Sequence, residues 1–216
     1  MQKDVIELVE QQERLAQLRN RRGLIINPGA LGDCLLTLPL ASYMKQALDL
    51  GSVDLVANTQ YVGFYPGRTC VDTVRNIESI QFHRLFVDQH DFFLEEKDPL
   101  IGPLEGYEWI ISFMGEPDTD FEANLISTVF CSNSAEISIL EPIPSREPAG
   151  HISEFYVRRF MQENGLAAPF RFNAFGRLIT PLATDPQWGQ QLMRSVGIDT
   201  NRQVVVIHPG SGGRGK

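Results

Sequence analysis

The feature that most limits the possible folds is a pair of strand-to-loop junctions, one near each end of the chain. In the first, the apolar run Leu24-Ile25-Ile26 leads into Asn27-Pro28-Gly29-Ala30-Leu31-Gly32-Asp33. In the second, Val204-Val205-Val206-Ile207 leads into His208-Pro209-Gly210-Ser211-Gly212-Gly213-Arg214-Gly215-Lys216. Buried strands followed by glycine-rich loops are typical of parallel sheets covered by helices. The pair predicts two α/β domains, the second only begun at residue 216.

Between the junctions, apolar runs alternate with helical patterns, which predicts a doubly wound parallel sheet. Strands are expected at 23–27, 53–57, 73–77, 109–113, 128–131, 137–140 and 203–207. Helices are expected at 32–48, 83–88, 121–127, 151–164 and 185–196. The last two are each followed by a glycine at the position that usually ends a helix.

These elements divide the chain into four expected parts. Residues 1–22 form a helical arm, and residues 23–150 form the first Rossmann-like domain, closed by a proline-rich loop after residue 141. Residues 151–184 are an interdomain helix and connection, and residues 185–216 begin the second domain.

Composition narrows the class of protein. A chain of 216 residues with 43% hydrophobic content can bury a substantial core, and its formal net charge of −8 argues against nucleic-acid binding. It has no apolar run of the roughly 18 residues that a membrane span needs and no secretory signal pattern, so a cytoplasmic location is expected. Cys34, Cys70 and Cys131 form no CxxC pair, which indicates reduced thiols rather than a disulfide framework or a zinc site.

A local basic cluster departs from this acidic average. Arg19, Arg21 and Arg22 follow the polar helical stretch of the arm, and they could meet an anionic membrane surface or an acidic substrate. Alternatively they are solvated cations that complement the dipole of a helix end.

The glycine-rich loops can direct backbone N–H groups at an anion. The first loop does not match the P-loop pattern, because no lysine follows Gly32, and it lacks the dinucleotide fingerprint GxGxxG. A nicotinamide enzyme is therefore disfavoured. Gly29 and Gly32 are each explained by a positive φ or by close approach of the backbone, whether or not a ligand binds.

Asp33 is the most informative single residue, because it opens a helix at the carboxyl end of the first strand. Open α/β sheets bind their ligands at that edge, where a carboxylate can act as a general base on a sugar hydroxyl. The alternative is that Asp33 only caps the helix.

A second acidic motif, Asp118-Thr119-Asp120, matches the DxD pattern that binds a divalent cation in some glycosyltransferases. The simpler interpretation is that Asp118 or Asp120 caps the helix that follows, and no metal site is predicted. His151 either faces a cleft or lies exposed at a helix start, and His208 is interpreted as a core or hinge histidine rather than a catalyst.

The residues from Leu24 to Asp33, followed by Leu35-Leu36-Thr37-Leu38-Pro39, resemble the start of the ADP-heptose:lipopolysaccharide heptosyltransferases of glycosyltransferase family 9. The segment 208–216 resembles the motif that opens their second domain, and Trp109-Ile110-Ile111-Ser112-Phe113 and the His151 helix lie between. The resemblance implies a GT-B architecture of two Rossmann-like domains, the first binding the acceptor and the second the nucleotide-sugar.

The resemblance further implies metal-independent, inverting transfer of a heptose-like sugar from an ADP-sugar to a lipopolysaccharide-type or other glycan acceptor, with no cofactor and with Asp33 as the base. The acceptor-side loop would comprise Asn27, Gly29, Ala30 and Gly32. The donor diphosphate would be held by Ser211, Gly212, Gly213 and Lys216, with His151 and His208 near the cleft. Asn27 stands where many family members have arginine, so the acceptor is expected to differ.

Two other functions stay open from the residues alone. A first-domain fragment could bind a glycan or a protein without transferring sugar, and a nucleotide-binding regulator would bind ADP without depending on Asp33. Peripheral contact with the inner face of a membrane is compatible with the first hypothesis.

Overall fold

The computed structural model describes residues 21–132, 134–143, 150–167, 177–199, 202–205 and 207. The chain divides into two compact units, Met1–Thr180 and Pro181–Lys216. The boundaries of the four expected parts remain predictions. Residues 1–20 of the expected helical arm and the glycine-rich segment 208–216 lie outside the described residues.

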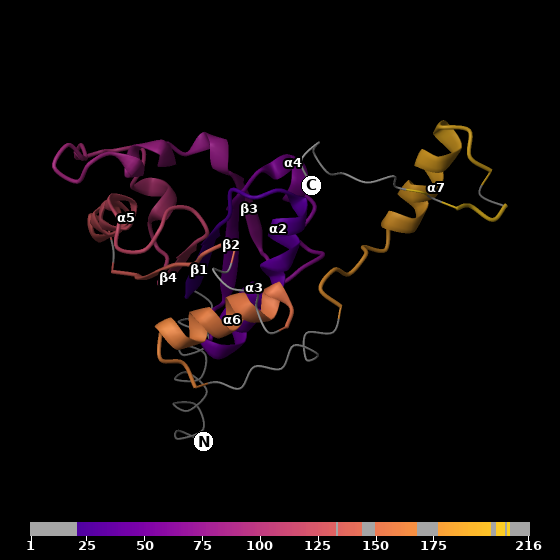
Figure 1. Ribbon diagram of the computed structural model, residues 1–216. Helices are drawn as coiled ribbons and strands as arrows, with labels where there is room; N and C mark the ends of the chain where they lie inside the picture. The colour runs from indigo at the N-terminus through magenta and orange to yellow at the C-terminus, as the bar shows by residue number, and fades with distance from the viewer. Residues whose placement is uncertain are drawn as a thin grey trace, which may run out of the picture. The chain divides into compact units, whose positions relative to one another are not determined.

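Unit 1 is built on a parallel sheet of five strands in the order β3-β2-β1-β4-β5 (Figure 1). The strands are β1 (Arg22–Ile26), β2 (Ser52–Ala57), β3 (Thr73–Asn76), β4 (Trp109–Ser112) and β5 (Glu136–Ile139). Each lies at or within a residue or two of an expected strand. The predicted doubly wound α/β sheet is therefore confirmed.

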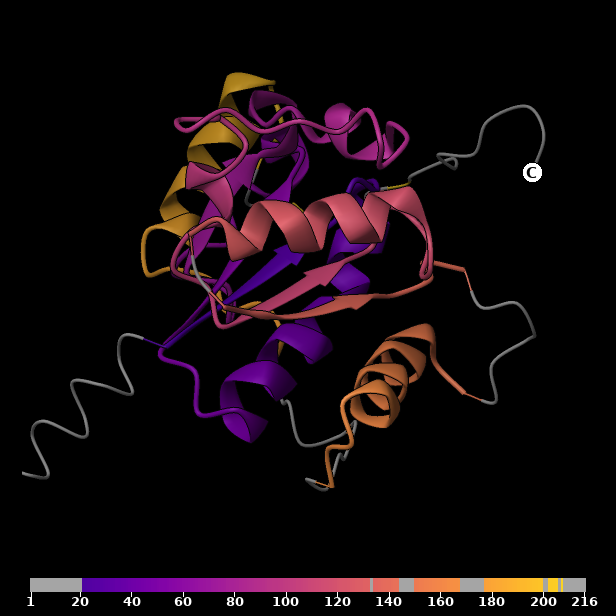
Figure 2. The ribbon, with the colours of Figure 1, turned by 90° about the vertical axis from the view of Figure 1, so that its left-hand side faces the viewer.

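Alternating side chains of the central strands enter two separate cores, as the period of a strand requires. Ile25 of β1 and Ile111 of β4 face a core with α3 (Leu38–Ala47) and α6 (Ile152–Glu163). Leu24 and Ile110 face the other core, which is closed by α5 (Asp120–Phe130). Figure 2 shows α5 lying across one face of the sheet.

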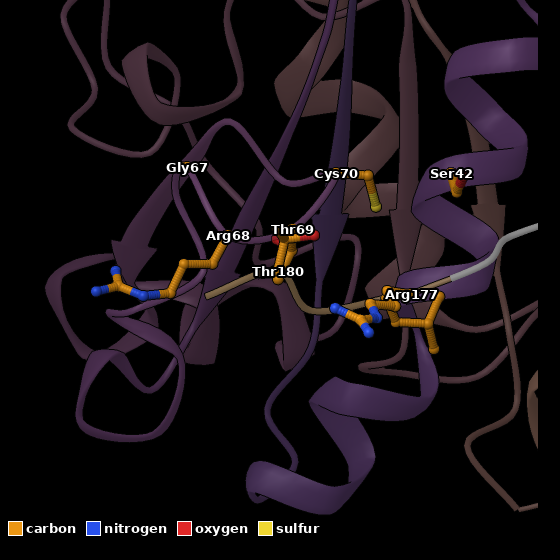
Figure 3. Close-up of a pocket in the computed structure, with 8 residues that line it drawn as sticks. Ser42, Gly67, Arg68, Thr69, Cys70, Arg177 and Thr180 are labelled. Atoms are coloured by element: carbon orange, nitrogen blue, oxygen red, sulfur yellow. The ribbon is translucent and has the colours of Figure 1, made fainter. Parts of the chain in front are cut away.

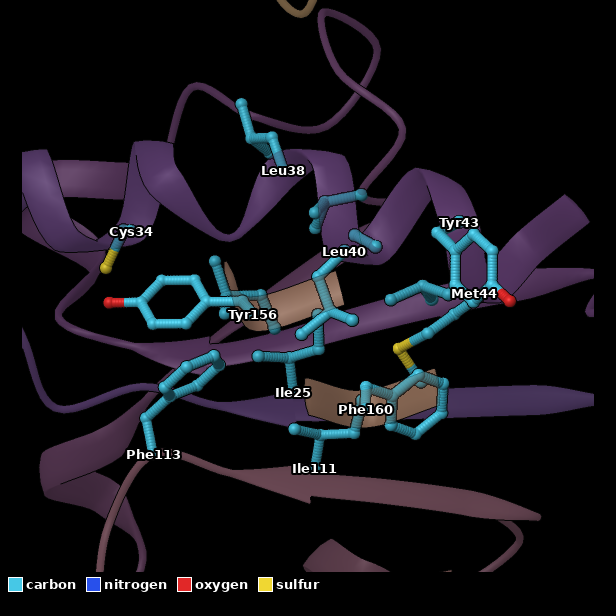
Figure 4. Packing of buried hydrophobic residues seen from close by; sticks show 14 of the residues in the cluster. Ile25, Cys34, Leu38, Leu40, Tyr43, Met44, Ile111, Phe113, Tyr156 and Phe160 are labelled. Atoms are coloured by element: carbon cyan, nitrogen blue, oxygen red, sulfur yellow. The ribbon is translucent and has the colours of Figure 1, made fainter. Parts of the chain in front are cut away.

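Helix α6 belongs to the first core. Its Phe160 is fully buried and makes an edge-on ring contact with Trp109, at 5.6 Å between ring centroids. A second edge-on contact joins Phe160 to Tyr43 of α3, at 6.4 Å between centroids (Figure 4). Because α6 is anchored on unit 1, its outward side chains are fixed relative to the sheet.

Three sequence-based assignments of secondary structure in unit 1 are wrong. Residues 128–131 are the end of α5 and its C-cap, since Phe121, Leu125 and Val129 recur at helical spacing and are all buried. The expected helix 32–48 is split into α2 (Leu31–Leu36) and α3, with Thr37 as the junction and a proline in the first turn of α3. The expected helix 83–88 is a 3-10 helix, Phe82–Phe86.

The remaining short elements of unit 1 connect the strands. They are α4 (Thr59–Val62) and two 3-10 helices, Ile77–Ser79 and Gly102–Leu104.

In the parts of the chain that the structure describes, no helix is both long enough and apolar enough to cross a membrane.

Unit 2 contains α7 (Asp185–Ser195), which confirms the helix expected there. The strand expected at 203–207 does not form at residues 203–205 and 207. A strand exists only when it pairs with a neighbour, and the described residues of unit 2 supply none.

The basic cluster ahead of β1 is partly structural. Arg22 contacts the buried carboxylate of Asp54 at 2.6 Å, and the hydroxyl of Tyr107 donates to the same oxygen at 2.7 Å. Arg21 pairs with Glu108 at 2.8 Å. These two arginines are thus engaged by carboxylates of unit 1 rather than solvated at a helix end, while Arg19 lies outside the described residues.

Candidate functional site

The strand order identifies one edge of the sheet as the place for a ligand. From β1 the chain adds β2 and β3 on one side and then returns to add β4 and β5 on the other, so the winding reverses between β1 and β4. Ligands of open α/β sheets bind at the carboxyl ends of the strands at such a reversal. The loops after β1 and β4 therefore bound the candidate site.

The loop after β1 is shaped by Asn27, which is almost fully buried. Its side-chain Oδ1 accepts a hydrogen bond from the backbone N–H of Gly29 at 2.8 Å. Asn58 after β2 and Asn76 at the end of β3 make the same bond to the backbone N–H two residues onward. The amide oxygen of Asn27 thus closes an Asx turn, which is a structural role.

Asp33 is exposed and lies at the third position of α2. Its Oδ2 accepts a hydrogen bond from the backbone N–H of Ala30, the N-cap residue, at 2.9 Å. The carboxylate therefore does cap its helix, as one of the two interpretations required. Capping is compatible with a further role, because a carboxylate has a second oxygen and additional lone pairs.

The two glycines of this loop differ. A Cβ on Gly29 would lie 2.5 Å from Cβ of Asp33 and 2.9 Å from Oδ1 of Asn27, so close approach accounts for this glycine. A Cβ on Gly32 would meet no atom of the described residues within 4 Å, and its φ is not positive. The expectation that the fold itself requires a glycine at 32 is wrong, because that position faces open space.

Beneath the loop lies a group of buried protic side chains. The thiol of Cys34 donates to the carbonyl of Gly29 at 3.6 Å, and burial, assisted by the charge of Asp33, raises the pKa of this thiol to about 11. The hydroxyl of Tyr65 is fully buried and has no hydrogen-bond partner among the described residues. Burial also raises the pKa of Tyr65, so both groups are protonated at neutral pH.

A cavity of about 850 Å³ opens at the same edge of the sheet. We call it the carboxyl-edge cavity. It is lined by Pro28 after β1, residues 113–117 after β4, residues 141–143 after β5, and Arg159 of α6. Its size falls in the range of small-molecule sites.

Tyr156 of α6 connects Asp33 with this cavity. Its ring packs on Phe113 at 4.8 Å between centroids (Figure 4). Its hydroxyl donates to the carbonyl of Pro142 at 2.7 Å, so Tyr156 touches two of the lining residues. Burial, and secondarily the charge of Asp33, raises the pKa of Tyr156 to about 12. Tyr156 thus lies against the cavity lining and within electrostatic range of Asp33.

The charged residues of the cavity are mainly carboxylates. Glu116 and Glu141 line it, and the lining cation Arg159 is paired with Glu163 at 2.6 Å. Burial raises the pKa of Glu163, with Arg159 opposing the change and the neighbouring carboxylates of Glu122 and Glu141 adding to it.

The DxD motif adopts a different geometry from the one expected. Thr119, not an aspartate, is the N-cap residue of α5. Asp118 has a left-handed backbone with φ 58°, and its N–H donates to Glu122 at 2.8 Å. Asp120 is already helical, and its Oδ1 accepts from the N–H of Gln89 at 3.3 Å. Within the described ranges, no three His, Cys, Asp or Glu side chains gather as a metal site.

His151 is the exposed N-cap of α6, and its Nδ1 accepts from the backbone N–H of Ser153 at 3.2 Å. Its role at a cleft stays a prediction. The other predicted residues, Ser211, Gly212, Gly213, Lys216 and His208, lie outside the described residues.

A second cavity, of about 190 Å³, lies between α3 and the chain that leads into β3. Arg68 and Arg177 are among its lining residues, and in Figure 3 the guanidinium of Arg68 points away from the others. The two arginines therefore do not form a clamp for one anion.

Sequence reasoning missed Glu116, Glu141 and Arg159. The same rule that selected Asp33 would have found the two glutamates, because each follows a strand near the reversal. Arg159 had no such signal, since its place depends on how α6 packs.

The fold and site together define a Rossmann-like α/β protein with a ligand cavity at the reversal of its sheet. Neither a protein-family model nor a curated protein sequence matches the chain. Among solved structures, the chain is similar to a family 9 glycosyltransferase from Veillonella parvula, at 11% identity and a TM-score of 0.53. That match covers 88% of this chain and 55% of the other, so this chain spans about half of that protein's length.

The chain is also similar to the E. coli heptosyltransferase WaaC. With ADP-2-deoxy-2-fluoro heptose bound, that structure matches at 18% identity and a TM-score of 0.42, over 69% of this chain and 50% of the other. The structure of WaaC with ADP matches at 17% identity and a TM-score of 0.41, over 69% of this chain and 49% of the other. The predicted resemblance is confirmed at the level of the fold, which is glycosyltransferase family 9-like, by the first structure.

Proposed function

We propose that the chain belongs to an inverting glycosyltransferase, in which unit 1 binds the acceptor and the loop after residue 207 binds an ADP-sugar. One observation carries the proposal: an exposed carboxylate on a closed loop and a cavity of about 850 Å³ occupy the same edge of the sheet. The glycosyltransferase fold supports it. In this proposal the donor carries a heptose-like sugar, and the acceptor is a lipopolysaccharide-type or other glycan.

In this mechanism Asp33 removes the proton from an acceptor hydroxyl. The hydroxyl oxygen then forms a bond to the anomeric carbon of the donor sugar while the bond from that carbon to the diphosphate oxygen breaks. ADP leaves with the electron pair, and the configuration at the anomeric carbon inverts. General-base assistance of this kind contributes about 100-fold or more to a rate.

The leaving diphosphate needs compensation of its charge. We assign this role to the backbone N–H groups of Ser211, Gly212 and Gly213 and to the ammonium of Lys216, with His208 at the start of the loop. Charge-assisted hydrogen bonds to phosphate oxygens are strong, and they grow in importance as the bond to the sugar breaks.

The proposal includes a cytoplasmic location, which is supported by three free cysteines, Cys34, Cys70 and Cys131. Arg21 and Arg22 are paired with carboxylates, so within the basic cluster we assign peripheral contact with a membrane to Arg19.

Calorimetric titration of the chain with ADP and with ADP-heptose tests the donor assignment. We expect binding that Lys216→Ala weakens about tenfold, which corresponds to about 1.4 kcal/mol. Lys97→Ala is the control, because Lys97 is an exposed lysine outside the carboxyl-edge cavity. Loss of affinity in both variants, or no binding of ADP, would overturn the donor assignment and favour a glycan-binding module without transfer.

A further inference from the structure

We propose that the part of the acceptor that enters the carboxyl-edge cavity is an uncharged sugar, and that Glu116 and Glu141 determine this specificity. The inference rests on the proposed function, because it takes the cavity to be the acceptor site. It departs from an anionic acceptor such as a phosphorylated or acidic glycan.

The balance of charge is the first argument. Glu116 and Glu141 each bring a carboxylate to the lining, while the positive charge of Arg159 is compensated by Glu163 at 2.6 Å. Among the described residues the lining is therefore net negative, and a phosphate or carboxylate entering the cavity would be repelled by the carboxylates of Glu116 and Glu141.

The chemistry of the lining is the second argument. Two carboxylates offer acceptor oxygens for several hydroxyl groups. Met114, Pro117, Pro142 and Ile143 add apolar surface from the loops after β4 and β5. A sugar ring presents hydroxyl donors at its edge and C–H groups on its faces, so a neutral sugar satisfies both kinds of lining.

The first loop adds no cation to this balance. Asn27 is uncharged, and its amide oxygen accepts the hydrogen bond that closes the turn at Gly29. Asp33, at the same edge, is itself a carboxylate. Among the described lining residues, only Arg159 could then pair with an anionic acceptor. Such pairing would require Arg159 to give up its ion pair with Glu163.

A glycan array that holds matched pairs of oligosaccharides, identical except for a phosphate, sulfate or uronic carboxylate, tests the inference. The fluorescently labelled chain is compared with Glu116→Gln/Glu141→Gln and with Glu141→Lys. The control is Glu96→Gln/Glu105→Gln, which changes the same charge at two exposed glutamates outside the cavity.

We expect the wild-type chain to prefer the neutral member of a bound pair about tenfold. The double glutamine variant should narrow that preference, Glu141→Lys should reverse it, and the control should leave it unchanged. Equal or tighter wild-type binding of the anionic members, lost in Arg159→Gln, would overturn the inference while leaving a glycan site in place. Binding of neither member would instead contradict the proposed function.

Discussion

Gly29 and Asp33 approach each other so closely that a Cβ on Gly29 would lie 2.5 Å from Cβ and 2.8 Å from Oδ2 of Asp33. This contact sets the carboxylate against the loop, where Oδ2 also accepts the N–H of Ala30. The position of the proposed base therefore depends on the absence of a side chain at residue 29.

Alanine substitutions at the two loop glycines test which of them is required because a side chain would not fit. Gly29→Ala should lower the free energy of unfolding by about 1–3 kcal/mol, because the loop has to shift away from Asp33. Gly32→Ala is the matched control, and it should be neutral or stabilise by up to about 1 kcal/mol, since it adds helix propensity in open space. Urea denaturation measures both values, and equal destabilisation would refute the described loop geometry.

Acid stability should depend on the pair formed by Arg84 and Asp98. Hydrogen bonds from Arg84 lower the pKa of the Asp98 carboxyl to about 2. A carboxyl with a depressed folded-state pKa stabilises the protein above its unfolded value near 4, and this stability is lost as the pH falls from about 4 to about 2. We expect a contribution of about 1–2 kcal/mol, reduced by solvent around Arg84.

The measurement for this pair is urea denaturation at a series of pH values between 2 and 6 for wild type and Asp98→Asn. The variant should be less stable at pH 6 and should lose less stability on acidification. Parallel curves for the two proteins would show that Asp98 does not carry the effect.

A buried hydroxyl should contribute to the second core. Tyr107 donates to Asp54 at 2.7 Å, and Arg22 lies over its ring at 4.3 Å. Tyr107→Phe should cost about 1 kcal/mol, because one acceptor interaction of a buried carboxylate is lost. Tyr61→Phe, at an exposed tyrosine, should change nothing. Thermal unfolding compares them, and equal melting temperatures for both variants would argue against the network.

The three cysteines should react with thiol reagents in a fixed order. Cys131 is exposed, whereas burial raises the pKa of both Cys34 and Cys70 to about 11. At pH 8, iodoacetamide should label Cys131 first, since the thiolate is the reactive form and needs access. Peptide mass spectrometry reads the order. Cys131→Ser should remove the fast phase, and rapid labelling of Cys34 in the folded chain would contradict its burial.

Much of the fold was predictable from sequence because its strands are short apolar runs that end in turn residues. The run Leu24-Ile25-Ile26 and the asparagine after it predict β1 and its turn directly. The segment Thr128-Val129-Phe130-Cys131 misled for a physical reason: β-branched and aromatic residues favour strands locally, but burial at the spacing of Phe121, Leu125 and Val129 stabilises a helix.

The candidate site was predictable only where it follows a strand. Asp33 was found from its place after β1, and its hydrogen bond to Ala30 was anticipated as a cap. The contribution of Arg159 depends on the tertiary packing of α6 through Tyr156 and Phe160, which no local pattern contains. Strand order, which places the reversal between β1 and β4, likewise arises from long-range pairing.

The most direct test of the central claim is sugar transfer by the wild-type protein and by Asp33→Asn, measured as ADP released from ADP-heptose in the presence of a glycan acceptor selected on the array. Asparagine keeps a side-chain oxygen for the N–H of Ala30, so the melting temperature should change little. The account predicts acceptor-dependent ADP release that falls about 100-fold or more in the variant. Transfer by Asp33→Asn at the wild-type rate, or no transfer by the wild type, would contradict it.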